Sequence, residues 1–104
     1  MRITREKIEE FAKYVNDTNP IHYGKDCIAP AIMILSMLLA KIVRKHPYIA
    51  ITESFVKFSV PVRPGDRLRF KYAVKNKHIQ AVVTNQDNTP VISIKSKYVK
   101  WRMK

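Results

Sequence analysis

Cysteine and glycine are scarce in this 104-residue sequence, and each scarcity removes a class of structure. The single cysteine, Cys27, excludes an intrachain disulfide, and a cysteine-based metal site is not expected. Because Cys27 lies beside an apolar segment with no adjoining histidine, we expect a buried, unreactive thiol. Glycine occurs only at positions 24 and 65, and there is no repeat, low-complexity tract or linker. The length then predicts one small domain over residues 1–104.

A targeting segment and a membrane span are also missing from the apolar pattern. Residues 1–6 contain no apolar run of the signal-peptide type, so we expect a cytoplasmic protein. The longest apolar stretch, residues 28–43, is interrupted by Pro30, Ser36 and Lys41 and is shorter than the ~20 residues that a bilayer requires. We therefore expect no membrane partner, and a helix buried inside the protein instead.

Acidic residues are few, since eight Asp and Glu stand against twenty Lys and Arg, for a formal net charge of +12. Such a charge attracts polyanions such as nucleic acid, an anionic membrane or a phosphorylated cofactor, and it also fits a generally basic surface. Arg67, Arg69 and Lys71 alternate with apolar residues, as on a solvated strand face. No nucleic-acid-binding motif is present, so a nucleic-acid partner is not expected. The role of the charge stays open.

The hydrophobic periodicity predicts two helices followed by four strands. Residues 4–16 show an amphipathic pattern with Thr4 as the expected N-cap, and residues 29–45 form a second helix, apolar nearly all round, with Pro30 at its first position. The expected strands are residues 50–60, 67–76, 79–85 and 91–102, with a short one at residues 1–3. Short turns between strands predict an antiparallel meander. The expected fold class is α+β, with a long buried central helix wrapped by a curved antiparallel β-sheet.

Residues 17–22, Asp-Thr-Asn-Pro-Ile-His, carry the strongest functional signal. Proline disfavours helix for the residue before it, so Asn19 lies in a turn that lets Asp17 and His22 point to one place. A carboxylate beside an imidazole is a common general acid–base pair and can activate a water. A structural alternative stays open, in which Asp17 forms an Asx turn with Asn19 and His22 is a satisfied loop histidine. We expect the motif on a surface loop.

Three stretches of the sequence resemble one enzyme family, in the family's order. The first is residues 3–12 followed by Asp-x-Asn-Pro-x-His at residues 17–22, which matches a hydratase motif after a first helix. The second is the entry to the central helix at residues 28–33, and the third is Phe-x-x-Pro-Val-x-x-Gly-Asp-x-Leu at residues 58–68. The third is typical of hot-dog proteins in general, whereas the first is more specific. The chain resembles the MaoC-like (R)-specific enoyl-CoA hydratases, which have the hot-dog fold.

This resemblance implies a lyase of fatty acid metabolism, a hydro-lyase that adds water to trans-2-enoyl-CoA to give (R)-3-hydroxyacyl-CoA. By the resemblance, Asp17 and His22 hold and activate the water, Asn19 orients the loop or the pair at the substrate site, and the backbone N–H of Ala31 receives the enolate oxygen. No metal and no cofactor are implied beyond the coenzyme A of the substrate. A homodimer or higher homo-oligomer is expected, which would also cover open edge strands.

Two departures from the family pattern leave details open. Only residues 23–29 separate His22 from the central helix, a shorter segment than in the family, so acyl chain length and pocket shape are not specified. The helix entry is Pro30-Ala31 where the family usually has His-Gly, although the group concerned is a backbone N–H. The carrier of the acyl thioester, CoA or an acyl-carrier protein, is also open. Two other functions remain as alternatives: a hot-dog acyl-CoA thioesterase and a non-catalytic acyl-CoA-binding module.

Overall fold

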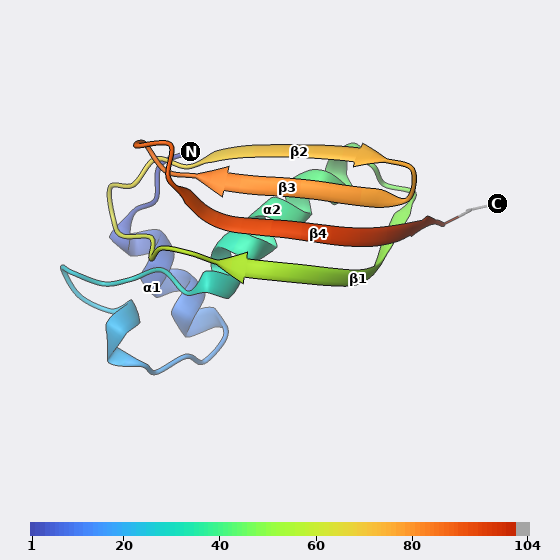
Figure 1. Cartoon of the computed structure of the whole chain (residues 1–104). Coiled ribbons are helices and arrows are strands. Elements are labelled where there is room, and N and C mark those ends of the chain that lie inside the picture. Colours follow the sequence, from blue (N-terminus) through green and yellow to red (C-terminus); the bar gives the residue numbers. More distant parts are fainter. Residues whose placement is uncertain (102–104) are drawn as a thin grey trace.

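A computed structural model, which describes residues 1–101, places the long helix against one face of a four-stranded antiparallel sheet (Figure 1). The helical elements are α1 (Arg5–Tyr14), the short 3-10 turn η1 (Pro20–His22) and α2 (Ala31–Lys45). The strands are β1 (Ile49–Phe58), β2 (Arg69–Lys75), β3 (His78–Thr84) and β4 (Pro90–Lys100). This confirms the expected α+β architecture. The last expected strand extended to residue 102, which lies outside the described residues.

The sheet order is β1-β4-β3-β2, and all neighbouring strands are antiparallel. Strands β2, β3 and β4 form the expected meander, but the prediction is wrong for β1, which pairs with β4 and not with β2. The Pro-rich segment 59–68 is therefore a crossover to the opposite edge of the sheet, and not a hairpin turn (Figure 1). Proline cannot donate a ladder hydrogen bond, so such a segment stays outside the sheet.

The N-terminal residues hold this crossover in place. The N–H of Ile3 donates to the carbonyl of Asp66 at 2.8 Å, and the N–H of Gly65 donates to the carbonyl of Ile3 at 2.7 Å. Gly65 has a φ of 94°, in the left-handed region that favours glycine. The short strand expected at residues 1–3 is only a single bridge between Arg2 and Arg67. Residues 1–3 therefore fix the approach to β2 without adding a regular strand to the sheet.

Helix α1 leads directly into the motif loop. Thr4 caps it as expected, because its side-chain oxygen accepts a hydrogen bond from the N–H of Lys7 at 3.2 Å. Ile8 and Ala12 are fully buried on its inner side. The helix ends at Tyr14, and Asn16 follows with a φ of 57°, a left-handed conformation that is common just after a helix. The chain then enters the loop at residue 17.

Helix α2 begins at Ala31, and Pro30 is its N-cap and not its first helical residue. Its inner side packs into the core through four apolar residues, Met33, Ile34, Leu38 and Ile42. The outer side carries Ile32 and Val43, which are 53% and 41% exposed. The central helix is thus buried on the side that faces the sheet, and its other side is exposed because one sheet covers only one side of a helix. Within residues 1–101, no helix has the length and hydrophobicity to cross a bilayer.

Leu38 tests the assigned core, because its side chain is 0% exposed on the inner side of α2. The substitution Leu38→Ala removes buried methyl groups and should lower the free energy of unfolding by about 2–5 kcal/mol. Urea unfolding followed by circular dichroism measures this loss. Lys45→Ala, in the exposed last turn of the same helix, should cost about 1 kcal/mol or less. Equal losses in the two variants would contradict the core assignment.

Cys27 provides a second test of burial. It is 1% exposed, and this burial, with a smaller contribution from the Glu9 carboxylate, raises the pKa of its thiol above the usual range. A higher pKa leaves less of the reactive thiolate at neutral pH. Ellman's reagent should therefore react with the native protein far more slowly than with the protein unfolded in urea. Similar rates in the two states would place Cys27 at the surface.

Candidate active site

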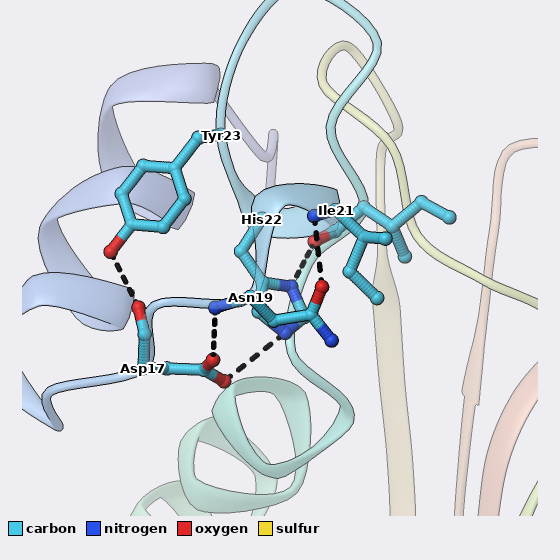
Figure 2. Close-up of polar contacts among 6 residues, drawn as sticks. Asp17, Asn19, Ile21, His22 and Tyr23 are labelled. Carbon is cyan, nitrogen blue, oxygen red and sulfur yellow. Dashed lines mark hydrogen bonds and ion pairs between the residues drawn. The ribbon is translucent and has the colours of Figure 1, made fainter.

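The motif loop begins with a tight turn built by the side chains of Asp17 and Asn19 (Figure 2). The backbone N–H of Asn19 donates to Oδ1 of Asp17 at 3.0 Å, and Oδ1 of Asn19 accepts from the N–H of Ile21 at 3.1 Å. Asn19 has an extended backbone, as expected for the residue before Pro20. The Asx turn offered as a structural alternative is therefore present. It does not compete with a role for the Asp17 carboxylate, because Oδ2 remains for another partner.

The imidazole of His22 is buried and held in one orientation. Only 7% of His22 is exposed, so the expectation that the whole motif lies at the surface is wrong for this residue. Its Nδ1 lies 2.7 Å from the carbonyl oxygen of Ile28, because the chain folds back over the ring (Figure 2). A carbonyl oxygen can only accept, so Nδ1 carries the hydrogen of this contact. The other ring nitrogen, Nε2, is left for chemistry.

Asp17 and His22 contact each other through that nitrogen. Nε2 of His22 lies 3.2 Å from Oδ2 of Asp17, so the structure brings together the two residues that the motif singled out (Figure 2). The side chains are 9% and 34% exposed for His22 and Asp17, so solvent reaches the pair at the carboxylate. A contact of this kind needs one proton between the nitrogen and the oxygen. The pair can therefore accept a proton at one atom and release one at the other.

Two partners of the pair carry no functional signal in the sequence. The hydroxyl of Tyr23 donates to the backbone carbonyl of Asp17 at 2.6 Å and holds the start of the loop against its end. The Ile28 carbonyl orients the ring of His22, but a backbone contact leaves no mark on residue type. Tyr23 directly follows the motif, and this position is the only feature of the sequence that could have indicated its contact with Asp17. Within residues 1–101, no group of three or more His, Cys, Asp and Glu side chains is placed to hold a metal ion.

A cavity of about 330 Å³ connects His22 with the start of α2. Its walls are mostly apolar and include Ile21, Ile28 and Phe58, with His22 and Ala31 also among the lining residues. The first N–H groups of a helix have no partner inside the helix and point toward its N-terminal end. Ala31 is the first residue of α2, so its N–H is such a donor. The mostly apolar wall of the cavity thus includes two residues with polar groups, His22 with its imidazole and Ala31 with its backbone N–H.

The four expected site residues do not all reach this cavity. His22 and Ala31 line it, whereas Asp17 and Asn19 do not. Asp17 instead contacts the cavity-lining ring through Nε2 of His22. The side chain of Asn19 caps the turn at residues 20–22, and its backbone N–H holds the Asp17 carboxylate. Asn19 therefore positions the loop, and any contribution it makes to the site goes through Asp17.

No protein-family model and no curated protein sequence matches this chain. Solved structures do resemble it. R-hydratase PhaJ1 from Pseudomonas aeruginosa, in the unliganded form, matches with a TM-score of 0.87 at 21% identity, over 99% of this chain and 77% of that one. A MaoC-like dehydratase from Rhodospirillum rubrum matches with a TM-score of 0.78 at 19% identity, over 100% of this chain and 88% of that one. A chain of the HadBC complex of Mycobacterium tuberculosis, a 3R-hydroxyacyl-ACP dehydratase, matches with a TM-score of 0.71 at 18% identity, over 95% of this chain and 89% of that one. The chain therefore has the hot-dog fold of the MaoC-like dehydratases and (R)-hydratases.

Proposed function

We propose that the protein is a hydro-lyase that adds water to a trans-2-enoyl thioester and forms the (R)-3-hydroxyacyl product. The main observation behind this proposal is the contact between Nε2 of His22 and Oδ2 of Asp17. The imidazole ring of His22 also lines an apolar cavity at the start of α2. The fold supports the proposal, since the similar structures named above include hydratases and dehydratases. Hydration and dehydration are the two directions of one reaction.

The proton balance of the pair fits this reaction. Hydration needs a base that takes a proton from water as its oxygen attacks C3, and an acid that delivers a proton to C2. The carboxylate of Asp17 takes the proton of the water, and Nε2 of His22 gives its proton to C2. The proton gained by Asp17 then crosses the 3.2 Å contact to Nε2. One hydroxyl and one hydrogen are added to the double bond, and the pair returns to its starting state.

The start of α2 supplies the third element of the mechanism. As the water attacks C3, negative charge develops on the thioester oxygen, and a backbone N–H at a helix N-terminus stabilises such charge. The N–H of Ala31 would fill this role. Donors of this kind contribute about 3 kcal/mol to the transition state. A side-chain substitution at Ala31 leaves the N–H in place, so the donor does not depend on the residue type.

The cavity favours a short acyl chain. Its volume of about 330 Å³ is near the lower limit of small-molecule sites, which span roughly 300–1,000 Å³. Its apolar wall suits the hydrocarbon end of the substrate, while the thioester would lie at the polar groups of His22 and Ala31. We propose coenzyme A or an acyl-carrier protein as the carrier of the thioester.

We also propose that the active protein is a homodimer. Within residues 1–101, strand β1 pairs only with β4, so its second edge is open, and its Phe55 and Phe58 are 74% and 49% exposed. The outer side of α2 exposes Ile32 and Val43 in the same chain. Open strand edges and exposed apolar side chains both favour association. A second copy pairing along β1, with the two α2 helices side by side, would cover both features.

Kinetics test the assigned pair. Purified protein should hydrate crotonyl-CoA, followed as loss of the conjugated enone absorbance. Asp17→Asn and His22→Ala should each lower kcat by roughly a hundredfold or more, the usual contribution of a positioned acid or base. The double variant should lose little more activity than the less active single variant, because the two residues work as one unit that passes a proton between them. Chiral analysis of the product should give the (R) alcohol.

Two controls separate catalysis from folding. Asp26→Asn removes an exposed carboxylate from the same loop and should leave kcat within about twofold. His22→Asn offers an amide donor to the Ile28 carbonyl, so it should be more stable than His22→Ala while losing as much activity. A folded wild-type protein that turns over no enoyl thioester would favour the non-catalytic acyl-CoA-binding module, and hydrolysis of the thioester would favour the thioesterase.

Sedimentation velocity tests the dimer. The wild-type protein should sediment as a dimer at micromolar concentration, and Val43→Asp should shift it toward monomer by placing a charge on the outer side of α2. Val99→Asp is a matched control, because Val99 is 46% exposed and lies on β4 away from α2. It should sediment like the wild type. A stable wild-type monomer, or equal dissociation of both variants, would contradict the proposed interface.

A further inference from the structure

A large cavity lies away from the Asp17–His22 pair. It has a volume of about 1,050 Å³ and lies between the second half of α2, the start of β2 and the turn joining β3 to β4. It shares no lining residue with the cavity at His22. Lys41, on its α2 wall, is about 15 Å along the helix from Ala31, at about 1.5 Å per residue. We call this cavity the cationic groove.

The groove gathers positive charge without a matching negative charge. Five cationic side chains line it: Lys41, Arg44 and Lys45 on α2, Arg67 at the end of the crossover segment 59–68, and Arg69 at the start of β2. Met1 also lines the groove. No Asp or Glu is among the lining residues, and within residues 1–101 none of the five side chains takes part in an ion pair. Unpaired cations that converge in a concave site are the features of an anion-binding site.

Two acidic residues adjoin the groove but are not among its lining residues: Asp66, which contacts Gln86, and Asp87, which stands between Gln86 and Asn88 in the sequence. Asp66 accepts a hydrogen bond from the side chain of Gln86 at 3.1 Å, and Gln86 lines the groove. The other carboxylate oxygen of Asp66 accepts from the N–H of Arg63 at 2.9 Å. Asp66 thus holds the turn at residues 63–66 and supports Gln86 from behind. The C-terminal end of α2 adds a partial negative charge near Lys45, which the five cations outweigh.

Size and lining point to a ligand larger than a single phosphate. The groove is at the upper end of small-molecule sites, so one phosphate would leave most of it unfilled. Phe70 and Tyr72 provide aromatic surface, and Nζ of Lys41 lies 5.3 Å from the centre of the Phe70 ring. Side-chain amides of Asn85, Gln86 and Asn88 form a neutral polar wall. Aromatic faces and amides suit a nucleobase, and the cations suit its phosphates.

We propose that the cationic groove binds a nucleotide through its phosphate groups. The phosphates lie against Lys41, Arg44 and Arg67, and the base lies toward Phe70 and the amide wall. Two sources share this chemistry, a free nucleoside polyphosphate and the phosphorylated adenosine end of coenzyme A. The inference does not depend on hydration at Asp17 and His22, since the two cavities have no residue in common.

Isothermal titration calorimetry with ATP, coenzyme A and AMP tests the proposal. ATP or coenzyme A should bind the wild-type protein with one saturable site, more tightly than AMP. The triple variant Lys41→Gln/Arg44→Gln/Arg67→Gln should weaken this binding about tenfold or more, since it removes three charged donors whose hydrogen bonds to the phosphates contribute to the binding free energy. Tighter binding of coenzyme A would identify the carrier end of the acyl thioester, and tighter binding of ATP would identify a separate nucleotide. Both outcomes support the proposal that the cationic groove binds a nucleotide.

A matched control distinguishes the groove from general surface charge. Lys57, Lys71 and Lys95 lie together around another surface depression, formed by all four strands. Their triple replacement by Gln removes the same net charge and should change the affinity by about twofold or less. Equal weakening by the two triple variants, or no saturable binding, would overturn the proposal. Binding of a single-stranded oligonucleotide without binding of ATP or coenzyme A would overturn it as well. If the groove variant does not fold, Arg44→Gln alone, on the exposed side of α2, replaces it.

Discussion

The hydrogen bond between Nδ1 of His22 and the carbonyl of Ile28 is the contact on which the arrangement of the site depends. It fixes the ring, and only with this ring orientation does Nε2 face Oδ2 of Asp17. The same segment is tied down on both sides, because the N–H of Ile28 donates to Ile21 at 2.7 Å and the N–H of Ala29 donates to Val62 at 2.7 Å. The short segment between motif and helix therefore positions both the Asp17–His22 pair and the start of α2.

Helix α2 connects two regions of different chemistry. Its first residue, Ala31, lies at the apolar cavity beside His22, and its last turns carry Arg44 and Lys45 into the cationic groove. The formal charge of +12 is therefore not spread evenly in space. Basic residues that are far apart in sequence, on α2 and at the start of β2, gather in one cavity because β2 forms the edge of the sheet next to the end of α2.

Local patterns predicted much of the fold and of the site. Apolar periodicity predicted both helices, and the Asn19-Pro20 turn predicted that Asp17 and His22 would meet. The position of β1 beside β4 was not predictable in this way, because turn residues reveal that the chain leaves the sheet but not which edge it reaches next. The exposed side of α2 follows from how much surface one sheet covers, and the Ile28 contact involves a backbone atom that any residue has. These features depend on tertiary packing and not on residue type.

The central claim is that an enoyl thioester reacts between the Asp17–His22 pair and the N-terminus of α2. A crystal structure of the Asp17→Asn variant soaked with crotonyl-CoA tests it most directly, because we expect this variant to turn over its substrate slowly enough for the substrate to be seen. The thioester oxygen should lie within hydrogen-bond distance of the N–H of Ala31, with C2 facing Nε2 of His22 and C3 facing a water beside residue 17. A thioester bound outside the cavity, or one whose C2 faces away from His22, would contradict the account.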